Sequence, residues 1–217
     1  MSPALLVIHD TADPGAGGRW ADLLHAWPGD AIAPDLPGHG EAPPPTGGHY
    51  KAGDAAVAAW RAADQAGITS GEVWVLGHGW GAFAAEIVAA AGLASRLILV
   101  DGLGGPWRTA DELVADRHRW LRHVLADPAA LAPPATVPDP RLAHGFPSVW
   151  DRDFIGRMRR SITVPVLAVE SDASPTPSEE RDDRLRDFAG PTELVYATTD
   201  LPGAVTSCLR QAGWIQP

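Results

Sequence analysis

Short, continuous apolar runs alternate along most of the chain with segments whose apolar residues have helical spacing. The continuous runs predict strands buried on both faces, at residues 5–8, 31–35, 72–76, 96–101, 164–169 and 192–196. The segments with helical spacing predict helices at residues 20–27, 52–66, 82–91 and 179–188. Strands that alternate with helices in this way form parallel sheets, so the expected fold class is α/β, with about six strands flanked by helices.

Residues 106–160 interrupt this alternation. The segment contains a proline-rich stretch and no convincing strand, and it carries Trp107, Trp120, Trp150, His118, His123 and His144. An insertion on the carboxyl side of a parallel sheet is most simply a lid over a binding site. We therefore expect a core of residues 1–105 and 161–217, with residues 106–160 as a helical lid.

Composition narrows the classes of partner. A chain of 217 residues with 45% hydrophobic residues suits one well-buried domain. The net charge of −10 argues against nucleic acid or an anionic membrane surface as a partner. No apolar run approaches the ~18 residues of a membrane span, and no basic segment precedes the first strand, so we expect a cytoplasmic protein.

Cofactor motifs are missing from the sequence. Cys208 is the lone cysteine, and no cluster of histidine and cysteine has the spacing of a metal site. The glycines at positions 15–18 lack the spacing of a phosphate-binding loop. The expectation is therefore no metal and no cofactor.

The sequence Gly77-His78-Gly79-Trp80-Gly81 lies between a predicted strand and a predicted helix. A sharp turn between these elements needs small residues on both sides, which Gly77 and Gly81 supply. Such a turn presents the nucleophile of many hydrolases at its centre. The central position here is Gly79, which has no side chain that could attack a substrate.

Several spaced motifs together resemble the α/β-hydrolase family. They are residues 5–10, the turn Asp35-Leu36-Pro37-Gly38-His39-Gly40, the elbow at 77–81, and the strand ends at 99–101 and 164–167. The resemblance covers residues 4–105 and 161–215. It implies an α/β-hydrolase-like sheet from which the first two strands of the family are missing.

The resemblance also implies where a catalytic triad would stand. The nucleophile position is Gly79, and the acid position falls on Ser174, with Asp172 two residues away. The family's histidine comes late in the chain, whereas no histidine here follows His144. Covalent catalysis needs nucleophile, base and orienting acid together, so we expect a degenerate triad and no acyl-enzyme chemistry.

A binding pocket can survive the loss of the triad. The backbone N–H of Trp80, with that of Thr11 or Ala12, would form a donor pair of the oxyanion type. Asp10 stands where the family has glycine and is a candidate base. The expected pocket residues are His9, His78, Trp107, Trp120, His144 and Trp150.

Several of these residues also have an ordinary structural interpretation. His9, His39 and His78 lie at turns after strands, where a satisfied structural histidine is common. The lid tryptophans could form an aromatic wall or pack against the core.

Three hypotheses follow. The first is a non-hydrolytic protein that binds an apolar, carbonyl-containing small molecule and catalyses cyclisation, isomerisation or elimination in specialised metabolism. The second is a catalytically inert binding or scaffold protein, with a protein partner. The third is a hydrolase whose water is activated by an atypical group, such as Asp10 or one of His118, His123 and His144.

Overall fold

The computed structural model describes residues 2–11, 13, 18–45, 50–103, 110–127, 152–174, 176–197 and 201–215. Its strands are β1 (Ala4–Ile8), β2 (Ala31–Ile32), β3 (Val73–His78), β4 (Arg96–Val100), β5 (Val166–Ser171) and β6 (Thr192–Ala197). Its helices are α1 (Ala21–Ala26), α2 (Ala52–Gln65), the 3-10 turn η1 (Ile68–Ser70), α3 (Trp80–Ala90), α4 (Ala110–Ala126), α5 (Arg152–Arg159), α6 (Ser178–Leu185) and α7 (Leu201–Gln211).

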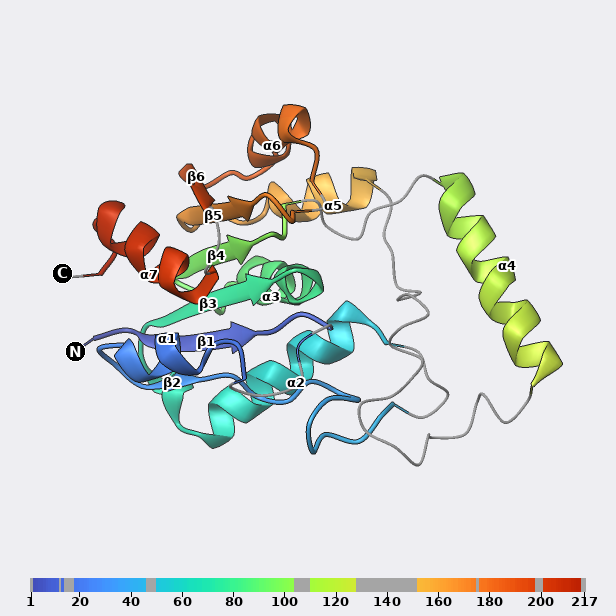
Figure 1. Ribbon diagram of the computed structural model, residues 1–217, viewed down its shortest axis with the longest axis horizontal. Helices are drawn as coiled ribbons and strands as arrows, with labels where there is room; N and C mark the ends of the chain where they lie inside the picture. Colours follow the sequence, from blue (N-terminus) through green and yellow to red (C-terminus); the bar gives the residue numbers. More distant parts are fainter. Residues whose placement is uncertain are drawn as a thin grey trace.

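The six strands form one parallel sheet in the order β2-β1-β3-β4-β5-β6 (Figure 1). This confirms the predicted α/β fold class. The edge strand β2 is shorter than the expected run of residues 31–35, because Pro34 has no N–H to donate to a neighbouring strand.

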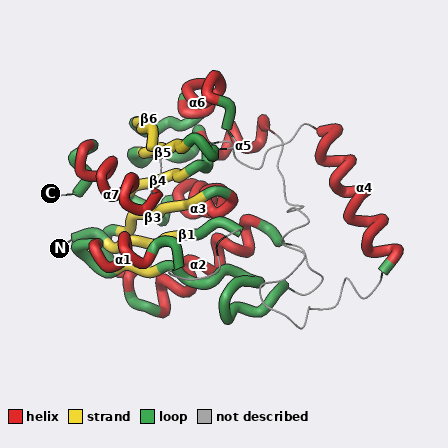
Figure 2. Tube along the Cα trace, in the orientation of Figure 1, coloured by secondary structure: helices red, strands yellow, loops and turns green. Residues whose placement is uncertain are grey.

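Alternate side chains of the central strands enter two separate cores, one on each face of the sheet. Leu6 and Ile8 of β1 face the core shared with α2 and α3, whereas Leu5 and Val7 face the core shared with α1 and α7. Both faces are therefore covered by helices, which is why these strands are continuous apolar runs (Figure 2).

The strand order reverses at one place. The chain passes from β1 outward to β2 and then returns to the other side of β1 to form β3, β4, β5 and β6. Ligands of open parallel sheets bind where the order reverses, beyond the carboxyl ends of the strands. In this chain that place lies between the ends of β1 and β3, immediately before Asp10 and Gly79.

The region after β4 is tied to the sheet by a buried ion pair. Arg159 of α5 donates to both carboxylate oxygens of Glu86 in α3, at 2.6 and 3.0 Å, and both side chains are fully buried. The same guanidinium donates to the carbonyl oxygen of Leu103 at 3.1 Å. These bonds bring Leu103, which follows β4, close to Arg159 at the end of α5.

Helix α4 lies beyond the carboxyl ends of the strands, on the side of the molecule away from both termini (Figure 1). This is the side on which the sequence places a lid. Within the described part of the chain, no helix is long and apolar enough to cross a membrane.

Candidate functional site

The turn between β3 and α3 has the backbone shape that the glycine-rich motif predicts. A Cβ on Gly77 would come within 2.3 Å of Ala82 Cα, and one on Gly81 would come within 2.3 Å of the Ile8 carbonyl oxygen. Gly79, at the centre, has φ of 54° and ψ of −121°. The flanking glycines thus permit the close approach of β1, β3 and α3 that a nucleophile elbow requires.

A carboxylate from the neighbouring strand fills the space above Gly79. A Cβ on Gly79 would come within 2.6 Å of both Cγ and Oδ1 of Asp10. The backbone N–H of Trp80, in the first turn of α3, donates to Asp10 Oδ1 at 2.9 Å. Asp10 therefore places its carboxylate where the side chain of an elbow nucleophile would begin, and a helix N-terminus stabilises negative charge there.

This geometry changes the role of the expected oxyanion donors. The Trp80 N–H is engaged by the protein's own carboxylate, and the contact found for Thr11 is its carbonyl oxygen, 3.1 Å from His39 Nε2. Ala12 lies outside the described residues. A substrate oxygen could reach the Trp80 N–H only by displacing Asp10.

A second acidic residue, Asp13, links Asp10 to His78, the histidine directly before Gly79. Asp13 accepts from the backbone N–H of Asp10 at 3.2 Å and from Arg19 Nε at 2.8 Å, and its Oδ2 lies 3.2 Å from His78 Nδ1. Burial alone would raise the pKa of Asp13, but the hydrogen bonds and charges of His78 and Arg19 outweigh it and lower that pKa to about 2. Asp13 is therefore ionised at neutral pH, next to Asp10 and His78.

His9 and His39 are held at both ring nitrogens. His9 Nε2 accepts from the Leu36 N–H at 3.3 Å, and Nδ1 lies 2.8 Å from the Asp10 carbonyl oxygen. Burial lowers the pKa of His9, against the hydrogen bond to that carbonyl. The nitrogens of His39 face the carbonyl oxygens of Pro37 and Thr11. Both rings thus connect the loops after β1 and β2, which is a structural role.

The expected acid position is occupied by a hydrogen-bonded serine. Ser174 donates its hydroxyl to Glu170 Oε2 and accepts from the Thr176 N–H at 3.1 Å. Glu170 is fully buried, also accepts from the Leu103 N–H at 3.1 Å, and lies 3.8 Å from Arg181 Nε. Burial raises the pKa of Glu170, against the hydrogen bonds from Ser174 and Leu103. Asp172 is exposed in the following turn.

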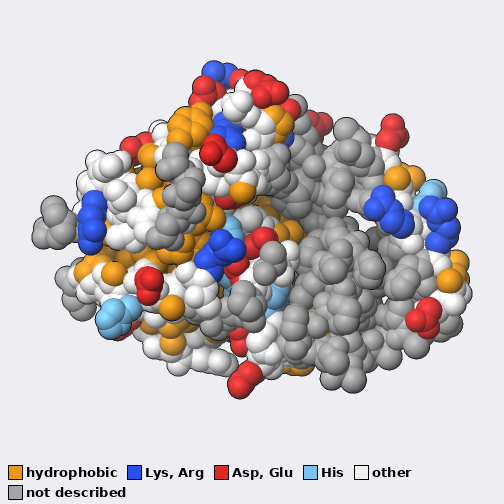
Figure 3. Space-filling model, in the orientation of Figure 1, with side chains coloured by type: hydrophobic (Ala, Val, Ile, Leu, Met, Phe, Trp, Pro, Cys, Tyr) orange, Lys and Arg blue, Asp and Glu red, His pale blue; other side chains and the backbone are white. Residues whose placement is uncertain are grey.

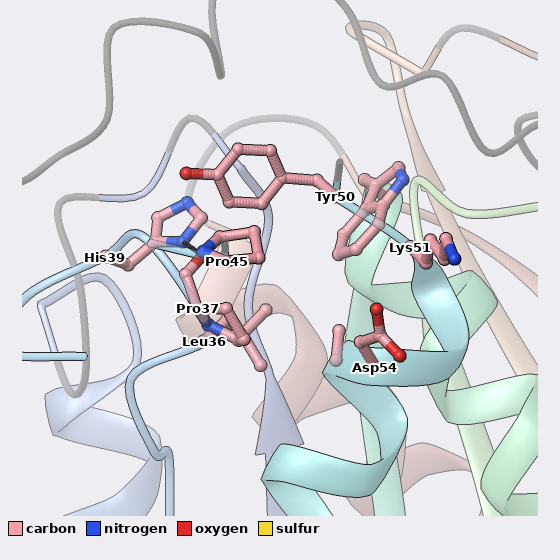
Figure 4. A pocket seen from close by; sticks show the side chains of 9 residues that line it. Leu36, Pro37, His39, Pro45, Tyr50, Lys51 and Asp54 are labelled. Atoms are coloured by element: carbon pink, nitrogen blue, oxygen red, sulfur yellow. Dashed lines mark hydrogen bonds between the residues drawn. The ribbon is translucent and has the colours of Figure 1, made fainter. Parts of the chain in front are cut away.

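A small, partly open pocket lies between the start of α2 and the turn after β2. In Figure 4, Tyr50 lies above His39 and Pro45, and Lys51 and Asp54 extend from α2 on the opposite side. The side chains around it are mostly apolar or aromatic, with few polar groups, as is usual for small-molecule sites. The lining residues are Leu36, Pro37, His39, Pro45, Tyr50, Lys51, Asp54, Ala55 and Trp80.

Trp80 is the one residue common to the expected site and this pocket. Tyr50, Lys51 and Asp54 were missed, because their only sequence signal is that they open a helix. Trp107, His144 and Trp150 lie outside the described residues, as do the side chains of Trp120 and His123 in α4. Acidic, basic and histidine side chains gather near the centre of the face shown in Figure 3.

Among the described residues, no group of three or more His, Cys, Asp and Glu side chains is placed to hold a metal ion. The expected absence of metals and cofactors stays a prediction.

Comparisons with solved structures find the same fold in several proteins. The thioesterase domain from the curacin biosynthetic pathway is 18% identical, with a TM-score of 0.70, over 99% of this chain and 91% of that one. A malate-bound thermophilic esterase from Thermogutta terrifontis is 18% identical, with a TM-score of 0.69, over 99% and 88%. A haloalkane dehalogenase loop variant from Bradyrhizobium elkanii is 17% identical, with a TM-score of 0.62, over 98% and 88%.

At these identities the structural likeness shows the fold alone. No curated protein sequence matches the chain. The family model described as "Alpha/beta hydrolase family", however, matches residues 5–214, which is nearly the whole chain. This protein therefore belongs to the alpha/beta hydrolase family.

Proposed function

We propose that this protein binds a small, largely apolar, carbonyl-containing molecule and acts on it by proton abstraction, with Asp10 as the base. The observation that carries the proposal is the Asp10 carboxylate above Gly79, in the place of the missing nucleophile side chain. A carboxylate beyond a strand end, held by a residue that lines a pocket, is suited to general base catalysis. Cyclisation, isomerisation or elimination would follow from removal of one proton.

Trp80 connects the proposed base to the proposed binding pocket. Its backbone N–H holds the Asp10 carboxylate, and the residue also lines the pocket with Tyr50. A ligand seated between these aromatic residues would therefore lie next to the residue that orients Asp10. Residues 106–160, with α4 and α5, would close over it as a lid.

We propose that no covalent intermediate forms, on the basis of the residues at the triad positions. Gly79 has no nucleophilic atom, Ser174 is hydrogen-bonded to Glu170, and no histidine follows His144. The structurally similar proteins include an esterase, a thioesterase and a dehalogenase. We propose that this chain keeps their fold and has a degenerate catalytic triad.

Deuterium exchange tests the proposal without knowledge of the natural product. β-Tetralone, a bicyclic ketone with acidic C–H groups beside its carbonyl, is incubated with the protein in D₂O and followed by NMR. We expect exchange above the buffer rate, and about a 100-fold loss in Asp10→Asn. The asparagine keeps an acceptor oxygen for the Trp80 N–H, so this variant removes the base and preserves the helix contact.

Asp22→Asn, an exposed carboxylate on α1, is the matched control and should exchange at the wild-type rate. Equal exchange by wild type and Asp10→Asn would exclude Asp10 as the base. Hydrolysis of p-nitrophenyl butyrate by the wild type would favour an atypical hydrolase instead.

An inert binding protein is the second candidate, and one observation favours it. The Asp10 carboxylate occupies the Trp80 N–H that would otherwise polarise a ligand carbonyl. Binding of β-tetralone with no exchange above buffer would identify this candidate.

A further inference from the structure

The elbow histidine has the geometry of a proton-transfer group. His78 ends β3, directly before Gly79, and is 6% exposed. Its Nδ1 lies 3.2 Å from Oδ2 of Asp13, whose side chain is 1% exposed. Arg19 Nε donates to the other oxygen of that carboxylate at 2.8 Å, which fixes its orientation.

The charge of Asp13 determines which nitrogen of His78 carries the proton. The pKa of Asp13 is about 2, because the hydrogen bonds and charges of His78 and Arg19 overcome the effect of burial. An ionised carboxylate only accepts hydrogen bonds, so Nδ1 of His78 carries a proton and donates it to Asp13 Oδ2. In the tautomer protonated only at Nδ1 the lone pair is at Nε2, and the same carboxylate would stabilise the imidazolium formed when Nε2 takes a proton.

His78 differs from the other two buried histidines in the contacts of its ring nitrogens. His9 and His39 are engaged at both ring nitrogens. Within the described ranges, His78 Nε2 has no hydrogen-bond partner. The ring of Trp20 meets that of His78 edge-to-face at 5.4 Å, and the buried Trp20 Nε1–H also has no acceptor among the described residues. A buried donor of this kind normally binds an oxygen atom, so it favours a water or ligand oxygen near His78.

We propose that Asp13 and His78 form a second proton-transfer group of this site, with His78 Nε2 as the atom that takes the proton. The proposal rests on the proposed proton-abstraction function. Asp10 follows β1 and His78 ends the adjacent strand β3, and Asp13 contacts His78 and accepts from the Asp10 backbone N–H. The ligand class is a small molecule with a C–H or O–H bond acidified by a nearby carbonyl.

The step is a proton transfer that needs no redox partner. An O–H or C–H bond of the ligand breaks, its electron pair stays on the ligand, and an N–H bond forms at His78 Nε2. The imidazolium then returns the proton to a different atom of the ligand, and the neutral ring is restored. The same ring thus removes a proton and delivers it, as isomerisation requires, and the Asp10 carboxylate can take and return a proton in the same way.

Two measurements test the dyad without any turnover. Long-range ¹H–¹⁵N correlation spectra of the full chain report the tautomer of each histidine, and we expect His78 to be protonated at Nδ1. Diethyl pyrocarbonate acylates accessible neutral imidazole nitrogens, and mass spectrometry locates the modified residue. We expect His78 to react, His9 and His39 to be protected, and the exposed His25 and His118 to react fastest.

An Nε2-protonated His78, or a His78 as unreactive as His9 and His39, would overturn the proposal. In the exchange assay, His78→Gln should lower kcat about 100-fold with little change in KM, whereas His25→Gln should change neither. If Asp10→Asn abolishes exchange and His78→Gln does not, the proposed function stands and the dyad is wrong. If the wild type catalyses no exchange, the proposed function is wrong, and the tautomer and acylation results decide whether His78 is a reactive base.

Discussion

Asp10 and Gly79 share the space of a single side chain. The carboxylate of Asp10 lies 2.6 Å from the point where a Cβ on Gly79 would stand, so a side chain at one position excludes one at the other. The related sequence pattern has glycine at position 10 and the nucleophile at position 79. In this chain the carboxylate that fills this space belongs to Asp10, in the loop after β1.

This exclusion predicts a non-additive pair of substitutions. Gly79→Ala should lower the free energy of unfolding by about 1–3 kcal/mol, because the new Cβ meets Asp10 and the positive φ disfavours a side chain. Asp10→Gly should restore part of that loss in the double variant. Urea unfolding of the four proteins measures the coupling, and strictly additive effects would show that the two positions do not compete.

Gly79→Ser should not create an esterase. No histidine follows His144 in the sequence to serve as the family's base, and the serine side chain would meet the Asp10 carboxylate. We expect Gly79→Ser and the double variant Asp10→Gly/Gly79→Ser to leave p-nitrophenyl butyrate hydrolysis at background. Circular dichroism must show both to be folded, and a burst of p-nitrophenol from either would show that a nearby group such as His78 activates the new serine.

The depressed pKa of Asp13 predicts a loss of stability in acid. Because the folded pKa lies below the unfolded one, the contribution is complete above about pH 4 and is lost as the pH falls toward about 2. The shift corresponds to about 2 kcal/mol. Urea unfolding at a series of pH values should therefore show a steeper fall of the unfolding free energy in acid for wild type than for Asp13→Asn. Parallel curves would show that the fold does not lower the pKa of Asp13.

The buried ion pair of Arg159 and Glu86 predicts that replacing one partner lowers the free energy of unfolding more than replacing both. Removing one partner, as in Arg159→Leu or Glu86→Leu, should cost about 3–5 kcal/mol, because the other charge stays buried without its partner. The double variant should recover much of this, since two apolar side chains of suitable volume replace both charges. Urea unfolding of the wild type and the three variants measures these free energies. A double variant less stable than both single variants would contradict the prediction.

Much of the fold could be predicted because the central strands are buried on both faces. Leu97 to Val100, for example, all lie at 0% exposure, so the strand is a continuous apolar run. The β3–α3 turn was also predictable, because close backbone contacts require glycine at positions 77 and 81. The length of β2 was not predictable, because the strand ends before Pro34 and lies at the edge of the sheet.

The site was less predictable because it depends on contacts between distant segments. Asp10 was noticed as a departure from the family pattern, but nothing in the sequence placed its carboxylate above Gly79. Asp13 and His78 are far apart in the chain, and only the parallel pairing of β1 with β3 brings their loops together. Tyr50 and Asp54 line the pocket because α2 begins next to the turn after β2, a packing relation without a sequence motif.

Arg159 fixes both ends of the segment between Leu103 and α5. It donates to the Leu103 carbonyl oxygen and pairs with Glu86 of α3. Once those ends are fixed, the closure entropy of the segment between them changes slowly with its length, by about 0.6 kcal/mol for each doubling. The core is therefore largely indifferent to the length of that segment. Insertions or deletions in that segment should therefore leave the stability of the sheet nearly unchanged.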